Sequence, residues 1–240
     1  MFDLMITLSV PLAFGVMWAV ESRFPARDYP RVSRWPWLGV AFFVLTAGVG
    51  SVIPHLWHSL GVPIGVWGSA APWLGVPAAI LLTTGLTYGW HRSVHTVNAL
   101  WLATHQLHHA PARVDIPGAF FSHPFEVAVK SSVGALVATA LLGLDPTSAS
   151  GVASIIGLLS LFQHWNVHTP RWLGWWVPRP EMHALHHVEG GRVVNFGDLP
   201  VWDWVFGTFV NPASFEGTVG FAGANTPKVG AMLLMRDVQD

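Results

Sequence analysis

Ten of the thirteen histidines in the chain form two copies of one pattern, H-x-x-x-H followed by H-x-x-H-H. The two copies comprise His91, His95, His105, His108 and His109, and then His164, His168, His183, His186 and His187. Residues three and four apart share one face of a helix, so each box directs its imidazoles at one point. Neutral imidazole binds iron, zinc, copper and nickel. The pattern therefore predicts a transition-metal site with enough ligands for two ions.

The histidines are not equivalent as ligands. Adjacent histidines on a helix point about 100° apart, so the pair in each H-x-x-H-H box can reach different metals or bracket one. Four of the ten histidines are also candidates for hydrogen-bonding a metal ligand instead of binding a metal themselves. They are His105, His164, His168 and His183.

Composition places this site in a membrane protein. Apolar residues make up 52% of the chain, charged residues 10%, and there are 14 tryptophans. A helix needs about 20 residues to cross the hydrocarbon core, so we expect three spans, over residues 2–20, 38–53 and 73–88. The apolar stretch 131–162 is too long for one crossing, and the sequence Gly143-Leu144-Asp145-Pro146 interrupts it. We expect this stretch to form a re-entrant helical hairpin.

The expected fold is all-α, a single polytopic membrane domain over residues 1–240. A histidine-rich cap is expected over residues 89–125 and 163–210. The first apolar run is expected to remain as an anchor rather than serve as a signal peptide, because its first charged residue is Asp3 and the run is longer than the usual signal core.

The distribution of positive residues predicts the orientation. Arg23, Arg27, Arg31 and Arg34 follow the first span, whereas residues 55–72 contain no Lys or Arg. Cytoplasmic loops carry an excess of positive charge, so the arginine-rich loop and both histidine copies are expected on the cytoplasmic side. His55 and His58 are expected in an external loop, too far away to join the site.

Metal-binding histidines need the other ring nitrogen held by a carboxylate, an amide or a carbonyl. Candidates for this role in the cap are Asn166, Glu181, Asn195, Asp198 and Asp203. Each has a structural alternative, such as a turn at Asn195, a helix cap at Glu181 and an arginine partner for Asp203.

Other residues near the histidines are expected to have structural roles. His123 precedes a proline, which favours a structural histidine. Arg92 follows His91 directly and would face another side of the helix, where it could form a salt bridge or contact a headgroup. Five tryptophans surround the second histidine copy: Trp172, Trp175, Trp176, Trp202 and Trp204. They are typical of an interfacial belt, and lining a substrate entry is the alternative.

The two histidine copies lie in stretches that resemble the fatty acid hydroxylase superfamily of integral-membrane proteins. The first stretch is YGWHRSVHTVNALWLATHQLHHAP, from Tyr88 to Pro111. The second stretch runs to Phe209 and includes the His-x-Asn box, the second H-x-x-H-H, Asn-x-Gly and Trp-Asp-x-x-Phe-Gly-Thr. The chain departs from the family upstream of His91, where many members have an acidic residue and this chain has Thr83, Thr84 and Thr87.

The resemblance implies a non-haem di-iron centre, with two Fe ions per chain, that uses dioxygen to hydroxylate or desaturate a lipid. The chain has no cysteine and therefore no Cys-bound iron–sulfur cluster, so we expect electrons from a separate electron-transfer protein. We expect no nucleic-acid partner.

Two other classes of function use the same residues. A zinc-dependent hydrolase or lyase would need no electron donor, and imidazoles also bind zinc. A protein that stores or carries metal would need ligands along a path through the spans, whereas these histidines gather at helix ends on one side.

Overall fold

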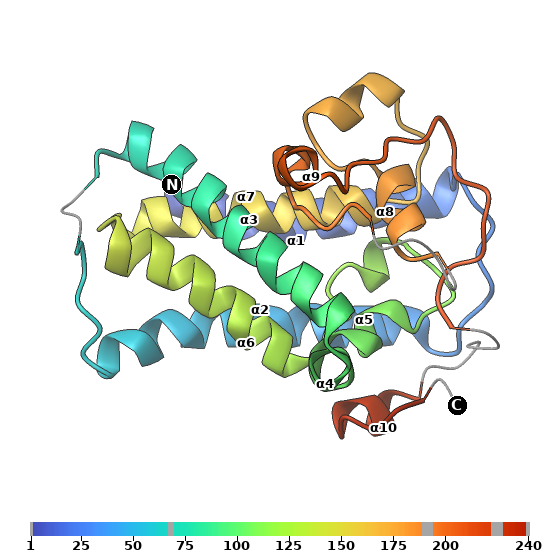
Figure 1. Ribbon diagram of the computed structural model, residues 1–240, viewed down its shortest axis with the longest axis horizontal. Helices are drawn as coiled ribbons and strands as arrows, with labels where there is room; N and C mark the ends of the chain where they lie inside the picture. The colour runs from blue at the N-terminus through green and yellow to red at the C-terminus, as the bar shows by residue number, and fades with distance from the viewer. Residues whose placement is uncertain (1, 67–69, 189–193, 222–227, 239–240) are drawn as a thin grey trace.

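The structure is a computed structural model that describes residues 2–66, 70–188, 194–221 and 228–238 (Figure 1). Its long helices are α1 (Phe2–Arg23), α2 (Trp35–Ser59), α3 (Pro72–Thr96), α6 (Pro124–Ala135) and α7 (Pro146–His164), and the π-helix η3 (Leu136–Leu141) extends α6. No strand occurs in the described ranges, where the only bridge pairs Val188 with Val219. The all-α prediction is therefore confirmed.

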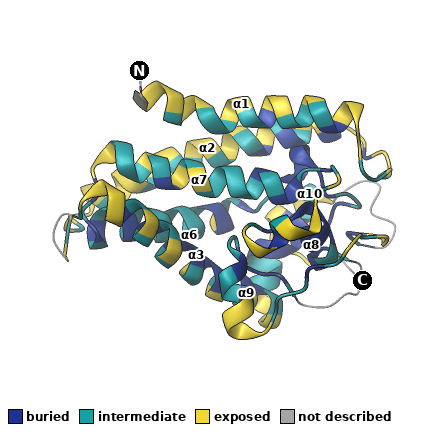
Figure 2. Ribbon diagram, turned by 90° about the horizontal axis from the view of Figure 1, so that it is seen from above, coloured by how far each residue is buried: buried dark blue, intermediate teal, exposed yellow. Residues whose placement is uncertain are grey.

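The long helices pack in pairs. Helix α1 lies along α7, α2 lies along α6, and α3 contacts both α6 and α7 (Figure 1). A buried apolar cluster that includes Ala79, Val137 and Val152 joins α3, η3 and α7. Many large apolar residues of α1 and α2 are exposed. Figure 2 shows the exposed stretches of the ribbon in yellow. Such outward apolar faces are typical of helices that contact lipid.

Within the residues that the structure describes, three helical segments are long and apolar enough to cross a membrane, namely Asp3–Arg23, Trp35–Ser59 and Pro124–Leu141. The expected number is confirmed, but the third segment is α6 with η3 rather than residues 73–88. The expected third span forms part of α3, whose polar residues, among them Thr83, Thr84 and Thr87, lower its hydropathy. The helices also extend beyond the expected limits, because backbone hydrogen bonds continue through polar residues where an apolar run stops.

The expected break in the long apolar stretch is confirmed. Helical structure ends at Leu141 and resumes at Pro146, with Gly143 in the left-handed conformation at φ 59°. The Asp145 side chain then accepts a hydrogen bond from the Ser148 amide at 3.0 Å, which caps α7. That this helix pair enters the membrane and returns remains a prediction.

Short elements surround one end of the bundle, where the cap is expected, and α10 joins them from beyond the expected limits. They are α4 (Asn98–Leu100), η1 (Trp101–His105), α5 (Gln106–His109), η2 (Ile116–Gly118), η4 (Arg171–Trp175), α8 (Pro180–His186), α9 (Pro200–Phe206) and α10 (Val229–Leu233). Proline opens α8 and α9, where its missing N–H costs no helical hydrogen bond.

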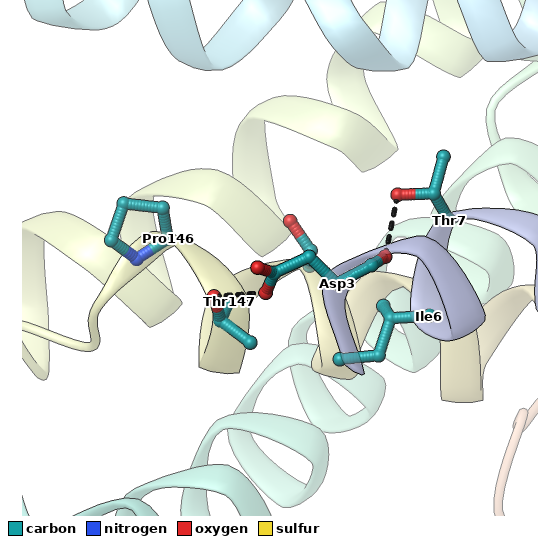
Figure 3. Close-up of a pocket in the computed structure, with 6 residues that line it drawn as sticks. Asp3, Ile6, Thr7, Pro146 and Thr147 are labelled. Atoms are coloured by element: carbon teal, nitrogen blue, oxygen red, sulfur yellow. Dashed lines mark hydrogen bonds between the residues drawn. The ribbon is translucent and has the colours of Figure 1, made fainter. Parts of the chain in front are cut away.

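A small pocket lies at the far end of the bundle, between the first turns of α1 and α7 (Figure 3). Its volume is about 320 Å³, and a hydrogen bond of 2.6 Å from the Thr147 hydroxyl to the Asp3 carboxylate crosses it. Thr147 and His164 stand at opposite ends of α7, about 25 Å apart at 1.5 Å per residue. The pocket is therefore separate from the histidines.

Candidate metal centre

The first two histidines lie on one face at the end of α3. The helix continues past Tyr88 to Thr96, so His91 and His95 are one turn apart, with ring centroids separated by 5.1 Å. After α3 the chain turns at Val97, and the π-helix η1 ends on His105. A π-turn is one residue wider than an α-turn and shifts the side chains that follow it, a feature common at functional sites.

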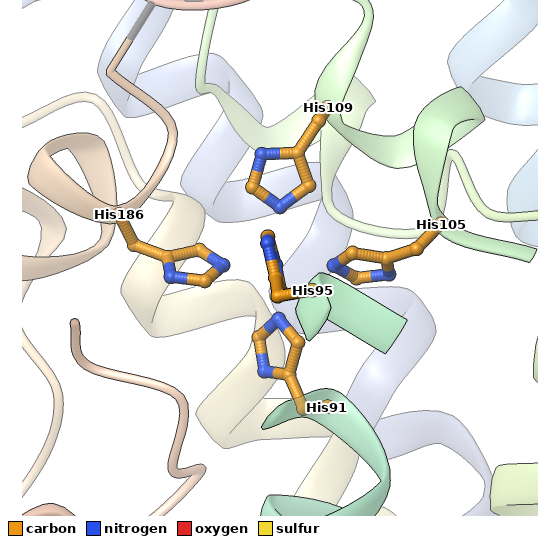
Figure 4. A group of neighbouring side chains, drawn as sticks. All are labelled: His91, His95, His105, His109 and His186. Atoms are coloured by element: carbon orange, nitrogen blue, oxygen red, sulfur yellow. The ribbon is translucent and has the colours of Figure 1, made fainter. Parts of the chain in front are cut away.

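Five histidines form the first group, which comprises His91, His95, His105, His109 and His186. One nitrogen of each ring lies within 4.8 Å of the corresponding nitrogen of every other ring. Figure 4 shows the five rings arranged around a common centre, with His91 and His95 from α3, His105 from η1, His109 from α5 and His186 from α8.

Four histidines form the second group, which comprises His108, His164, His183 and His187. His108 lies in α5, His164 ends α7, His183 lies in α8 and His187 caps α8, and the same limit of 4.8 Å applies to their nitrogens. The two groups are neighbours, because the rings of His109 and His187 stack with centroids 4.0 Å apart.

Each H-x-x-H-H box contributes two histidines to one group and one histidine to the other. His105 and His109 belong to the first group, whereas His108 between them belongs to the second. In the other box, His183 and His187 belong to the second group and His186 to the first. Each adjacent pair is thus divided between the groups, as expected for neighbours about 100° apart on a helix. Both boxes are needed to complete either group.

The first group presents unpaired nitrogen atoms to its centre. The Nε2 atoms of all five histidines are buried without a hydrogen-bond partner: His91, His95, His105, His109 and His186. Burying even one unpaired polar atom is unfavourable, so five in one place indicate a ligand that binds them together. A metal ion fits this donor set, because it accepts lone pairs from several neutral imidazoles.

The close nitrogen contacts of the second group also indicate a cation site. The Nε2 of His183 lies 3.1 Å from that of His164 and 3.0 Å from that of His187. The Nδ1 of His164 lies 2.8 Å from the Ser160 carbonyl, to which it donates, so the Nε2 of neutral His164 is a bare lone pair. One hydrogen on His183 can satisfy only one of its two contacts. Nitrogen ligands about 2.1 Å from a metal and at right angles lie about 3.0 Å apart, which matches this spacing.

Burial keeps these rings neutral. Loss of hydration lowers the pKa of His186 to about 4, although its hydrogen bond to the Val194 carbonyl opposes the shift. Burial, and then the neighbouring His187, hold the pKa of His109 well below its usual value. Neutral rings at pH 7 have free lone pairs, as metal binding requires.

Comparison with known proteins identifies the family. The sequence model described as fatty acid hydroxylase matches residues 76–208, more than half of the chain. The chain belongs to the fatty acid hydroxylase family. The matched range contains all ten patterned histidines, and together with the three apolar helices it makes the chain an integral membrane protein.

Several relatives of this family member are lipid hydroxylases or monooxygenases by name. The sphingolipid C4-hydroxylase sur2 of Schizosaccharomyces pombe is 30% identical over 144 residues, covering 57% of this chain and 48% of its own length. Alkylglycerol monooxygenase of Xenopus tropicalis is 25% identical over 217 residues, with 75% and 44% coverage. The ornithine lipid hydroxylase OlsE of Rhizobium tropici is 28% identical over 160 residues, with 61% and 47% coverage. The chain spans about half the length of these relatives. No solved structure gives a significant match.

In this fatty acid hydroxylase family member, three rings of the first group are held by partners on the far side from the centre. The Nδ1 of His105 lies 3.0 Å from both oxygens of Glu126. The Nδ1 atoms of His91 and His186 each lie 2.7 Å from a backbone carbonyl, of Phe196 and Val194 respectively. A hydrogen on each Nδ1 leaves Nε2 as the lone pair that faces the centre.

Two of the five expected supporting residues act on the loop that provides these carbonyls. Asp203 accepts hydrogen bonds from the amides of Phe196 and Gly197, at 2.8 and 2.9 Å. Asn195 has a positive φ of 55°, and its side chain bonds the backbone of Met182 and Val210. Neither forms a hydrogen bond with a histidine side chain, so both support the site through the backbone.

The other three expected supporting residues bind partners other than the histidines. Asn166 bonds the backbone of Arg27, and Glu181 bonds Thr169 and forms an ion pair with Arg179. Asp198 accepts from Gln163 at 3.1 Å and from Thr87 at 3.5 Å. Asp198 thus places a carboxylate next to Thr87 of α3.

His168 lies outside both groups and is exposed. The expected helical spacing with His164 does not exist, because α7 ends at His164 and Trp165 is extended. His123 instead caps α6, accepting from the Phe125 amide at 3.1 Å, which agrees with a structural role. His55 and His58 lie in the last turns of α2 rather than in a loop, and they are not part of either group.

Sequence reasoning missed Glu126. Its side chain is fully buried, contacts His105, and forms an ion pair of 2.9 Å with Lys130. A signal was present, because Glu126 and Lys130 are charged residues four apart at the start of a long apolar stretch. Charges inside a membrane segment are unfavourable unless they have a function and a partner.

Proposed function

We propose that the chain is a membrane-bound oxidoreductase that holds two iron ions in its two histidine groups. In this proposal it uses dioxygen and external electrons to hydroxylate or desaturate a lipid. The observation that supports it most directly is the pair of adjacent histidine groups, whose ring nitrogens face two centres and lack hydrogen-bond partners in the first group. Family membership agrees with this chemistry.

The donor set favours iron over zinc. Structural and catalytic zinc sites use four ligands in tetrahedral geometry, whereas the first group offers five nitrogens. Iron, when bound, supplies the redox chemistry with dioxygen that oxidation of an unactivated C–H bond requires. A zinc-dependent hydrolase or lyase on the same histidines is the competing function, and metal analysis separates the two.

The protein's own residues prepare the site in three ways. Glu126 and the carbonyls of Phe196 and Val194 fix the rings so that Nε2 points inward. Burial keeps the imidazoles neutral and limits access of water. The two boxes hold the groups side by side through the stacked rings of His109 and His187.

The site is proposed to face the cytoplasm. The arginine-rich segment after α1 reaches the histidine end of the bundle, where the amide of Ala26 donates to the carbonyl of Asn166 at 2.9 Å. Asn166 lies two residues after His164. The positive loop and the histidines are therefore on the same side of the bundle, and positive loops favour the cytoplasm.

The proposed partners are a lipid, dioxygen and an electron-transfer protein. The relatives named above act on sphingolipid, alkylglycerol and ornithine lipid by their names. The chain has no cysteine with which to bind an iron–sulfur cluster, so a separate reductase is proposed to deliver electrons.

The first test is metal content with Mössbauer and X-ray absorption spectroscopy on protein from iron-supplemented cells, followed by lipid turnover with a reductase. About two irons per chain with nitrogen-dominated shells, and oxidation of a lipid of one of the three named classes, would support the proposal. Stoichiometric zinc that iron cannot replace, with no oxidation of lipid, would favour the hydrolytic function instead.

A further inference from the structure

Helix α9 of the cap is docked on the side of the long helix α3. The indole of Trp202 lies against Gly85 so closely that a Cβ at Gly85 would be 2.7 Å from Trp202 Cζ2. The same indole donates to the Thr84 hydroxyl at 3.0 Å. One turn further along α3, the rings of Tyr88 and Phe206 stack with centroids 5.0 Å apart. Helix α9 is thus fixed to α3 at two successive turns.

The same face of α3 carries exposed apolar side chains on the N-terminal side of its contact with α9. Leu74 is 57% exposed and Leu81 is 45% exposed. Leu74, Leu81 and Gly85 are separated by seven and four residues, so they lie along one face of the helix. At 1.5 Å per residue, Gly85 is only about 6 Å along the axis from Leu81. Helix α9 therefore continues an apolar surface that begins on the part of α3 where Ala79 packs with Val137 of the candidate span Pro124–Leu141.

The outer side of α9 is itself apolar. Trp204, Val205 and Phe206 are 44%, 64% and 52% exposed, and Figure 2 shows the outer turn of α9 in the exposed colour. The rings of Trp204 and Trp175 are 5.9 Å apart, which joins α9 to η4. We call this surface the tryptophan face; its members are Trp172, Trp175, Trp176, Trp204, Val205 and Phe206, all at least 44% exposed.

We propose that the tryptophan face is embedded in the lipid headgroup region of the bilayer, so that α9 and η4 form a membrane-binding surface of the cap. Tryptophan favours this region because its ring is apolar and its N–H is polar. Arg92 and Arg171 are exposed next to α9 and in η4, where their charges can meet lipid phosphates. Trp202 is not part of the surface, since its ring faces α3 rather than outward.

This placement has a consequence for the histidine groups. The loop that leads into α9 includes Phe196, whose carbonyl holds His91, and Asp203 of α9 anchors that loop. If α9 is embedded, this loop, which lies beside the first histidine group, is at the lipid boundary. Membrane contact of the tryptophan face does not depend on whether the metal is iron or zinc.

The absence of cysteine makes a direct test practical, because each introduced cysteine is a unique site for a nitroxide label. Val205→Cys labels the tryptophan face. Leu12→Cys, on a span and 62% exposed, is the lipid control, and Ser214→Cys, exposed between α9 and α10, is the water control. The full chain is placed in lipid nanodiscs, and electron paramagnetic resonance measures collisions with dioxygen and with a water-soluble nickel complex.

The label at residue 205 is expected to collide with dioxygen several-fold more than the Ser214 label does, and with nickel several-fold less. Its oxygen-to-nickel ratio should lie between those of the two controls, as expected for the headgroup region. A ratio equal to that at residue 214 overturns the proposal in favour of a water-exposed face. Low collision with both reagents also overturns it, since that result indicates a protein partner or second copy over the face. Unchanged circular dichroism and detergent elution of each labelled chain exclude misfolding.

Discussion

The rings of His109 and His187 lie face to face, with 4.0 Å between centroids and 13° between planes, although they belong to different histidine groups. His109 follows His108 directly in the chain, and His187 follows His186, so each stacked ring is the neighbour of a histidine in the other group. The two proposed metal sites are therefore adjacent, with this stacked pair of rings between them. Loss of either ring is expected to affect its own group most.

Removal of a histidine from one group should remove one of the two metals. His187→Ala is expected to reduce bound iron from about two per chain to about one, because a site of four ligands loses one that no neighbour replaces. Metal analysis of the purified chain measures this. His168→Ala is the matched control, since it removes a histidine of the same repeat that is exposed and outside both groups.

The control also tests the assignment of the groups. If His168→Ala lost as much metal as His187→Ala, the division of the histidines would be wrong. Full metal content in both variants would mean that neither histidine is needed for binding, and would remove the basis of the proposed function.

Glu126 should control the affinity of the first group. Glu126→Gln keeps the shape of the side chain but removes the charge that holds the Nδ1–H of His105. Loss of such a partner typically weakens metal binding about 10–100-fold. Competition with a chelator should show this loss for one of the two ions. Glu216→Gln, at an exposed carboxylate, should leave both ions unchanged, and equal losses in the two variants would argue against a local role for Glu126.

Acid should destabilise the metal-free chain. Burial lowers the pKa of His186 to about 4, so between that value and the ordinary value of 6.5 the unfolded chain binds a proton that the folded chain does not. The free energy of unfolding therefore falls as the pH is lowered from 6.5 to about 4, by up to about 1.4 kcal/mol per pH unit for such a histidine. Thermal unfolding in detergent across this range measures the slope. His186→Asn should reduce the slope, and an unchanged slope would assign it to other groups.

The pairing of His91 with His95 and of His183 with His187 was predictable, because helical spacing determines which rings of one helix share a face. The limits of that reasoning appear at His168, where the chain leaves α7 one residue after His164 and the spacing loses its meaning. The polarity of the residues around Trp165 did not indicate that the helix ends at His164.

The partners of the rings were less predictable for a different reason. His91 and His186 are held by carbonyls of Phe196 and Val194, and every residue has a carbonyl, so nothing in the sequence distinguishes these two. Glu126 could have been found, since a carboxylate at the start of an apolar stretch needs a partner. The expected carboxylates and amides were instead used to hold loops, as Asp203 does for Phe196 and Gly197.

The contact between α9 and α3 should depend on the absence of a side chain at Gly85. Gly85→Ala places a methyl group 2.7 to 3.0 Å from the Trp202 ring, and overpacking of this kind costs about 1–3 kcal/mol. Gly89→Ala, one turn away with nothing within 4 Å, should instead be neutral or stabilising by up to about 1 kcal/mol, because alanine favours the helix. Thermal unfolding of both variants in detergent measures the difference. In a chain that also carries Trp202→Ala, the cost of Gly85→Ala should disappear because the indole that it meets is gone; a cost that persists would place the strain elsewhere in α3.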